Sequence, residues 1–301
     1  MAKSGNSSYN IYEDVTRRIV MSLAQGVIPW RKRWASPTNE AAFYNYSTGR
    51  PYTGVINRLL LGTPGAFMTF KQAQAEGGHI VKGAKARIVI FFDPDYVPAK
   101  DKAEADRLKA AGEPWDHLKR PRYFAHNVFS IDDIEGLKPK EQPAEHREAE
   151  NPTDIANFVL TDYKDRTGVT IEEKISDCFL YDASTDTVKI PSRQQFPTEE
   201  QWYNTAFNGL VKSTAKEDRC NRAAAVKDNL KNIESIKEEL VSEIGAAMVL
   251  AGVELENIES EQDTKAECAK WMEALNKDFR LIVFAAAQAE KAAKYILKPL
   301  L

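Results

Sequence analysis

Four apolar residues recur at every fourth position near the start of the chain, namely Ile11, Val15, Ile19 and Leu23. This spacing places them on one face of a helix, and Gly26 then supplies a stop signal. The pattern therefore predicts an amphipathic helix from Tyr9 to Gln25. The next stretch, from Val27 to Gly54, is rich in Pro, Gly, Asn, Tyr and Trp, which is typical of loops and short strands.

Short helices and two strands are expected in the rest of the first half. The helices are predicted at Leu59–Leu61 and Thr69–Glu76. The runs Ala86–Phe92 and Arg122–Ile131 have the β-branched and aromatic content of strands, and we expect them to pair. Between them, Asp93–Pro121 is highly charged and bounded by prolines, so residues 93–121 are predicted to form a surface insertion.

The second half has helical spacing over most of its length. Four helices are predicted, at Asn151–Gly168, Thr198–Thr214, Lys227–Ala251 and Glu267–Leu297. Two strand-like runs separated by a turn predict a small hairpin, at Cys178–Tyr181 and Thr187–Ile190.

The charged, proline-punctuated segment 138–152 has few apolar residues, so it reads as a linker. We therefore predict an α+β protein of two domains, a mixed domain at 1–137 and a mostly helical domain with a small β-hairpin at 153–301.

Composition narrows the class of protein. The 301 residues are 43% hydrophobic and 28% charged, enough apolar material to bury one or two cores. No window approaches ~18 consecutive apolar residues and the start lacks an apolar signal core, so we expect a cytoplasmic protein without a membrane partner. The three cysteines form no CxxC pair, which indicates reduced thiols rather than disulfides or a zinc knuckle.

Charge divides the chain more sharply than its net value of −3 suggests. Residues 1–92 contain 12 Lys and Arg against 4 Asp and Glu, a net of +8. The chain totals of 41 and 44 leave 29 bases and 40 acids for the remainder, a net of −11. This division of charge predicts that the N-terminal part of the chain binds a polyanion.

A basic aromatic segment gives that prediction its chemistry. Trp30-Arg31-Lys32-Arg33-Trp34 places three cations between two indoles, and more aromatic and basic residues follow. Single-stranded nucleic acid offers phosphates and unpaired base faces, so cations interleaved with aromatic rings suit it better than a duplex. The alternative is that the rings are core residues whose neighbouring cations face water. The predicted DNA-binding residues are Trp30, Arg31, Lys32, Arg33, Trp34, Tyr44, Tyr46, Arg50, Tyr52, Arg58, Lys71, Lys82 and Lys85.

A succession of short motifs from residue 11 onward includes Gly26-Val27-Ile28-Pro29-Trp30, Thr48-Gly49-Arg50-Pro51-Tyr52 and Thr69-Phe70-Lys71-Gln72-Ala73. This succession resembles the N-terminal single-stranded-DNA-binding domain of ArdC-type antirestriction proteins, over roughly residues 9 to 135. The resemblance implies a protein of a plasmid or phage that shields incoming DNA from host restriction.

The second domain of that family is a zincin-like peptidase, and residues 151 to 298 resemble it. In that family one helix carries HExxH, whose two His bind zinc and whose Glu acts as general base, and a later helix supplies an acidic ligand. Glu238–Ala247 matches the later helix, with Glu239 and Glu243 as the ligand candidates. Spacing from the flanking motifs puts Asn208, Gly209 and Lys212 where His, Glu and His would stand.

Histidine counts agree with a lost zinc site. The four histidines are His79, His117, His126 and His146, so none lies in the second domain. We therefore predict no cofactor, no metal and no catalytic residue, and a pseudo-metallopeptidase. Because an unpaired buried carboxylate is costly, Lys212 is expected to replace the metal charge by pairing with Glu243 or, as the weaker alternative, Glu239. The other interpretation is that Lys212 is an ordinary surface lysine.

The leading prediction is a nonenzymatic antirestriction protein that coats single-stranded DNA nonspecifically. The alternative is an inhibitor of a host restriction or defence protein that acts through the acidic C-terminal region. An active metallopeptidase stands third.

Overall fold

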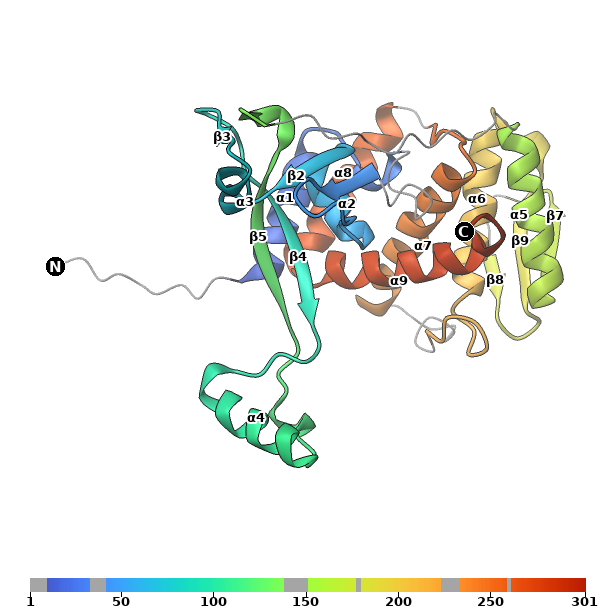
Figure 1. Cartoon of the computed structure of the whole chain (residues 1–301). Helices are drawn as coiled ribbons and strands as arrows, with labels where there is room; N and C mark the ends of the chain where they lie inside the picture. The colour runs from blue at the N-terminus through green and yellow to red at the C-terminus, as the bar shows by residue number, and fades with distance from the viewer. Residues whose placement is uncertain (1–9, 33–41, 138–150, 177–179, 223–232, 259–260) are drawn as a thin grey trace.

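The strands of the first half form a four-stranded sheet in the order β1-β2-β5-β4, with β1 parallel to β2 and the other pairs antiparallel. The computed structural model describes residues 10–32, 42–137, 151–176, 180–222, 233–258 and 261–301 (Figure 1). The strands are β1 (Phe43–Asn45), β2 (Gly65–Met68), β4 (Arg87–Asp93) and β5 (Arg122–Ser130), with β3 (His79–Ile80) and β6 (Ile134–Glu135) as a separate pair.

The three helices predicted in the first half are present, and a fourth lies between β4 and β5. They are α1 (Ile11–Ala24), α2 (Val55–Leu61), α3 (Phe70–Ala75) and α4 (Lys102–Ala111), with a 3₁₀ turn, η1, at Pro29–Arg31. The Asn10 side chain caps α1, and Thr69 and Gln72 form a capping box on α3. α2 begins four residues before its predicted start because Glu290, distant in sequence, accepts a hydrogen bond from the Val55 N–H at 2.7 Å.

The predicted strand pair is confirmed. β4 and β5 pair in an unbroken antiparallel register from Arg87↔Val128 to Asp93↔Arg122. The intervening residues, including α4, lie at the far end of this two-stranded ribbon, which projects from the body of the molecule (Figure 1).

The second half is mostly helical around a small three-stranded sheet, β7-β9-β8, as the α+β prediction requires. Its elements are α5 (Pro152–Thr167), β7 (Thr170–Lys174), β8 (Leu180–Asp182), β9 (Thr187–Pro191), α6 (Glu199–Ser213), α7 (Ile233–Gly252), α8 (Glu261–Lys277) and α9 (Leu281–Ile296). Further 3₁₀ turns lie at Ala99–Asp101, Asp116–Leu118, Ile131–Asp133, Arg193–Gln195 and Lys298–Leu300.

One helix prediction is wrong. The single helix expected at Glu267–Leu297 is two helices, α8 and α9, separated at residues 278–280. The Asp278 carboxylate accepts a hydrogen bond from the Arg280 N–H at 2.9 Å, a local turn that competes with helical hydrogen bonding. The apolar spacing continues through the turn, so periodicity alone missed the break.

The two halves share one hydrophobic core. Buried residues of α1, among them Val15 and Ile19, belong to the same cluster as Leu240 of α7 and Trp271 of α8. Trp30 of η1 packs edge-to-face on Trp271, with ring centroids 6.3 Å apart. The Thr16 hydroxyl also donates to the Phe279 carbonyl at 2.8 Å. The basic segment is therefore anchored to the C-terminal helices by ordinary core packing.

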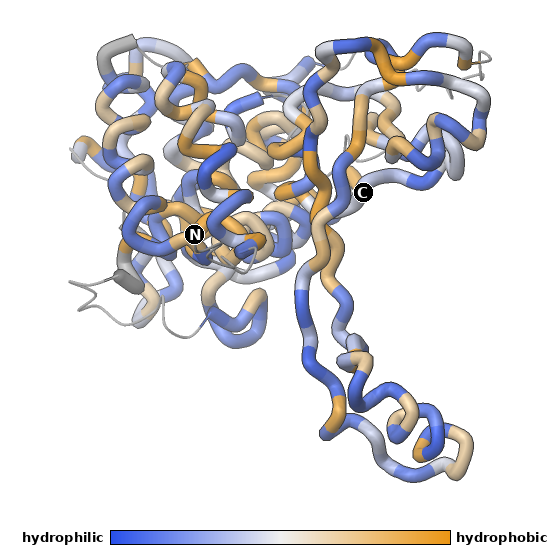
Figure 2. The backbone as a smooth tube through the Cα atoms, turned by 90° about the vertical axis from the view of Figure 1, so that its left-hand side faces the viewer, coloured by the Kyte–Doolittle hydropathy of each residue, from blue (hydrophilic) through white to orange (hydrophobic). Residues whose placement is uncertain are grey.

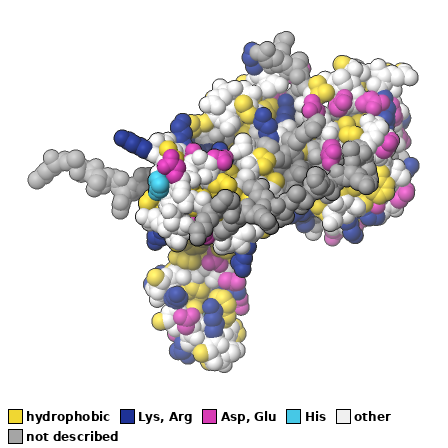
Figure 3. Space-filling view, turned by 45° about the horizontal axis from the view of Figure 1, so that its top comes forward, with side chains coloured by type: hydrophobic (Ala, Val, Ile, Leu, Met, Phe, Trp, Pro, Cys, Tyr) yellow, Lys and Arg dark blue, Asp and Glu magenta, His cyan; other side chains and the backbone are white. Residues whose placement is uncertain are grey.

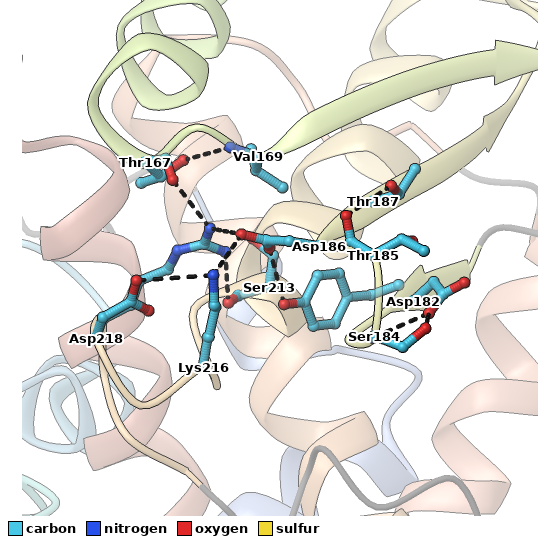
Figure 4. Close-up of polar contacts among 12 residues, drawn as sticks. Thr167, Val169, Asp182, Ser184, Thr185, Asp186, Thr187, Ser213, Lys216 and Asp218 are labelled. Carbon is cyan, nitrogen blue, oxygen red and sulfur yellow. Dashed lines mark hydrogen bonds and ion pairs between the residues drawn. The ribbon is translucent and has the colours of Figure 1, made fainter.

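A polar network ties the β8–β9 turn to the residues that follow α6 (Figure 4). The Asp186 carboxylate accepts hydrogen bonds from Lys216 at 2.8 Å, Arg219 at 2.6 Å and the Tyr181 hydroxyl at 2.9 Å. Burial alone would raise the pKa of Asp186, but these three donors outweigh it and hold the pKa below its usual value. The network fixes the tip of the hairpin beside α6.

The described residues test three further sequence predictions only in part. Residues 138–150 of the predicted linker lie outside the described ranges, so the domain boundaries stay a prediction. Cys220 and Cys268 are free and buried, whereas Cys178 is outside the described ranges. None of the helices within these ranges combines the length and apolarity needed to cross a membrane.

We expect the variant Asp186→Asn to be less stable than the wild type at neutral pH. The folded pKa of Asp186 is lowered, so its stabilising effect is present above its ordinary value of 3.8 and is lost as the pH falls through the folded value. The difference between variant and wild type should therefore shrink in acid, as measured by urea unfolding over a pH series. The variant Asp218→Asn, at an exposed side chain 3.7 Å from Lys216, is the control and should change little. A constant difference down to acidic pH would contradict this role.

Candidate functional site

The structure separates the predicted DNA-binding residues into an inner group whose side chains face the protein interior and an outer group of exposed cations. The inner group is Trp30, Arg31, Tyr46 and Arg58, and Tyr44 and Tyr52 are half-buried. Trp30 belongs to the inner group, since its side chain is 0% exposed against α8. The prediction that Trp30 stacks on DNA is therefore wrong, and the alternative, a core aromatic, is correct for this residue. Pro29 begins the short η1 turn and is buried beside it, which directs the indole inward.

Arg31 is also turned inward. Its guanidinium donates to the Glu243 carboxylate of α7 at 3.0 Å and to Glu267 of α8, and its side chain is only 10% exposed. A cation held by two carboxylates has its charge compensated within the protein, so Arg31 is not a phosphate-binding residue in this structure. The prediction for Arg31 is corrected accordingly.

Two more predicted residues are interior. Arg58 of α2 is 0% exposed, and its guanidinium lies 3.6 Å from the Glu290 carboxylate of α9. Tyr46 packs in a small core cluster with Met68 and Ala73. Neither side chain is accessible to DNA, because each is covered by elements that the sequence does not place next to it.

Tyr44 and Tyr52 are half-buried. The Tyr52 hydroxyl accepts from the Asn45 amide at 2.9 Å and donates to the Phe67 carbonyl at 3.3 Å. Burial raises the pKa of both tyrosines. Their rings therefore serve the packing around β1 and keep an exposed edge.

The outer group consists of exposed cations. They are Lys32 after η1, Arg50 in the turn after β1, Lys71 on α3, and Lys82 and Lys85 between β3 and β4. Phe70, beside Lys71, is an exposed aromatic residue at 53%. Figure 3 shows Lys and Arg side chains projecting at the end of the molecule that bears β3, among a few acidic ones. Arg33 and Trp34 lie outside the described residues.

The positions proposed for a peptidase motif lie on α6, which packs against α7 and β9. Asn208 is nearly buried, and a Cβ at Gly209 would collide with Cγ1 of Val188 on β9. Lys212 is half-buried, and burial lowers its pKa while the charge of Glu239 opposes that shift. Position 209 therefore has a close backbone approach that only glycine accommodates without movement of its neighbour.

The two predicted ligand candidates on α7, Glu239 and Glu243, are both paired with cations from other elements. Glu239 binds Lys270 of α8, and Glu243 binds Arg31. The cation that the structure shows on Glu243 comes from the first half of the chain, and the pairing of Lys212 stays a prediction. The charge of Glu239, its alternative partner, raises the pKa of Lys212 against the effect of burial. In the described part of the chain, no three His, Cys, Asp or Glu side chains gather as a metal-ligand group.

Known proteins match this arrangement in both halves. Residues 9–129 match the N-terminal domain of anti-restriction factor ArdC, and residues 160–288 match a zincin-like metallopeptidase family. The Mn(II)-bound crystal structure of the antirestriction ArdC protein from the R388 plasmid is 25% identical, with a TM-score of 0.67 over 96% of this chain and 98% of that one. The chain belongs to the ArdC antirestriction family.

Further relatives include two much longer proteins and two of similar length. Two DNA primases TraC from Escherichia coli are 32% and 31% identical over 95% of this chain. The chain spans only 27% and 20% of their lengths. An uncharacterised protein, y4eC, of Sinorhizobium fredii is 26% identical, and the chain spans 91% of it. The metal-free R388 ArdC structure is 26% identical, with a TM-score of 0.66, over 96% of this chain and 97% of that one.

Sequence reasoning missed the acidic partners of this ArdC-type chain. Glu267 and Glu290 bind Arg31 and Arg58, yet neither glutamate stands in a motif. The opposite net charges of the two parts were the available signal. That signal does not say whether the basic part meets an external polyanion or the protein's own acids.

We expect Arg31→Ala to lower the free energy of unfolding by about 3 kcal/mol, because it leaves Glu243 and Glu267 without their shared cation in a poorly hydrated site. The neighbouring exposed residue gives a matched control, and Lys32→Ala should stay within about 0.5 kcal/mol of the wild type. Urea unfolding measures both. Equal stability of the two variants would show that the ion pairs contribute nothing.

Proposed function

We propose that this ArdC-family protein binds single-stranded DNA without sequence preference and thereby shields DNA of a plasmid or phage from host restriction. The observation that carries the proposal is the outer group of exposed cations on the first domain. The charges of Arg31 and Arg58 are used internally, and subtracting them from the net +8 of residues 1–92 still leaves +6. A polyanion partner is what this remaining charge favours.

A single strand fits this surface better than a duplex. The cations lie in turns and on the six-residue helix α3 rather than along a helix long enough to enter a major groove. The exposed ring of Phe70 and the edges of Tyr44 and Tyr52 lie in the same domain, and aromatic rings bind unpaired bases. The R388 relative is named an antirestriction protein, which supports the shielding role.

We propose further that the zincin-like domain has no peptidase activity. The residues do not fit a catalytic zinc, since Asn208 and Lys212 offer an amide and a cation in place of two imidazoles. Gly209 has no carboxylate to act as general base, and its backbone is too close to Val188 for a side chain there without rearrangement. Arg31 binds the carboxylate of Glu243, which the resemblance would make a metal ligand.

The alternative role, inhibition of a host restriction or defence protein through the acidic C-terminal region, has less support. Glu243, Glu267 and Glu290 are engaged within the protein and are not free to contact a basic partner.

The DNA-binding proposal predicts that Lys71→Glu/Lys82→Glu weakens binding of a fluorescent single-stranded oligonucleotide at least about tenfold at low salt. The salt dependence should also fall, by a slope of about 0.7 for each lost phosphate contact. The control is Lys164→Glu/Lys298→Glu, which makes the same change in net charge at exposed lysines of the other domain and should bind normally. Anisotropy titrations over a salt series measure this, and equal binding of single-stranded and duplex oligonucleotides would contradict the proposal.

The pseudo-peptidase proposal predicts that protein incubated with zinc and desalted retains far less than about one zinc per chain and leaves casein intact. Elemental analysis and gel electrophoresis provide the two measurements. About one tightly held zinc per chain, lost in the variant Glu243→Gln, would overturn it.

A further inference from the structure

The outer half of the β4–β5 ribbon leaves the body of the molecule. β2 pairs with β5 only at Ser130 and Phe129, whereas β4 pairs with β5 as far out as Asp93 and Arg122. Residues 90–93 and 122–125 therefore form a two-stranded arm whose pairing extends beyond the reach of β2. Figures 1 and 2 show this arm from two directions, with apolar residues continuing outward along it.

Large aromatic residues lie exposed on the arm. Phe91 is 58% and Phe92 is 46% exposed, although strands usually turn such side chains towards a core. Phe91 lies opposite Phe124, and Phe92 lies opposite Tyr123. Because neighbouring residues of a strand point to opposite faces, each face of the arm carries one cross-strand aromatic pair.

The two faces differ in what lies beside them. On the Phe92 face, the Tyr123 ring packs edge-on against Tyr12 of α1, at a centroid distance of 5.9 Å. On the other face, the Phe124 ring contacts Tyr96 at 5.2 Å, and the Arg122 guanidinium lies 4.8 Å from its centroid. The first face is closed in part by the helical body, so the face of Phe91, Phe124 and Arg122 is the more open one.

The chemistry of this open face favours unpaired nucleotides over an apolar protein partner. A guanidinium on the same face as the exposed Phe91 ring supplies both a phosphate contact and a stacking surface. At the tip of the arm, Lys109 repeats the combination, 3.9 Å from the ring centroid of Trp115, whereas Lys119, at 4.2 Å, has its charge compensated by two carboxylates. Of the nearby acids, Asp95 and Asp116 are both paired with Lys119, at 2.8 Å and 2.6 Å, and Asp93 lies opposite Arg122 in the strand register.

We infer that Phe91, Phe124 and Arg122 form a second contact site for single-stranded DNA, in which a base stacks on the Phe91 and Phe124 rings and Arg122 binds the adjoining phosphate. This inference rests on the proposed single-stranded-DNA binding and places a stacking site outside the basic segment that the sequence singled out. The arm would extend the strand's path beyond the outer cations.

The test compares Phe91→Ala with the wild type on a single-stranded oligothymidylate. Loss of one stacked base should weaken binding about tenfold, while the salt dependence stays unchanged because no charge is removed. Phe158→Ala, at a phenylalanine of α5 that is 54% exposed, is the matched control and should bind like the wild type. Phe91→Trp should retain the affinity, and its added fluorescence should be quenched by the oligonucleotide.

The outcomes distinguish the two proposals. Failure of the wild type to bind overturns both. Normal binding by the wild type and equally by Phe91→Ala, with no quenching of Phe91→Trp, overturns the stacking site alone and leaves the DNA-binding proposal standing. If Phe91→Ala binds the oligonucleotide normally but no longer binds a restriction protein, the stacking site is overturned and the face contacts a protein partner. Thermal unfolding of each variant checks that the exposed substitution leaves the fold intact.

Discussion

The placement of the first domain depends on a guanidinium shared between two helices of the second. Arg31 lies between Glu243 of α7 and Glu267 of α8 in a site that is largely closed to water. Three charged groups in such a site are tolerable only when they stay together, because separating them would leave charge without solvent or partner. This fixes η1 on the C-terminal helices, and Trp30 fills the apolar space beside it. Arg58 and Glu290 form a second tie of the same kind.

These ion pairs divide the cations of the first domain into two groups with different roles. The inner cations, Arg31 and Arg58, neutralise acids of the second domain and hold the two halves together. The outer cations, such as Lys71 and Lys82, remain at the surface of the first domain. An arginine suits the inner role because its planar, weakly hydrated guanidinium can bind two carboxylates at once, whereas exposed lysines keep their hydration and meet phosphates as point charges.

Close backbone packing shapes the second domain. Gly209 lets α6 lie directly against Val188 of β9, and a Cβ at Gly245 of α7 would lie 2.9 Å from the Val211 side chain of α6. The helix pair is thus packed through glycine on two sides, which leaves little room for new side chains there. On α7, where the sequence predicted an acidic metal ligand, Glu243 receives a guanidinium from the first domain.

Most elements could be predicted from the sequence, because periodicity and capping act over a few residues. The capping residues of α1 and α3, and the paired content of β4 and β5, are local properties. The break at Asp278 was missed because apolar spacing continues through it, and the early start of α2 depends on Glu290, which is far away in sequence. The role of each aromatic and cationic residue was decided only by the tertiary structure. A cation beside a ring has the same sequence pattern whether it faces a phosphate or the protein's own carboxylate, and only packing determines which charge it meets.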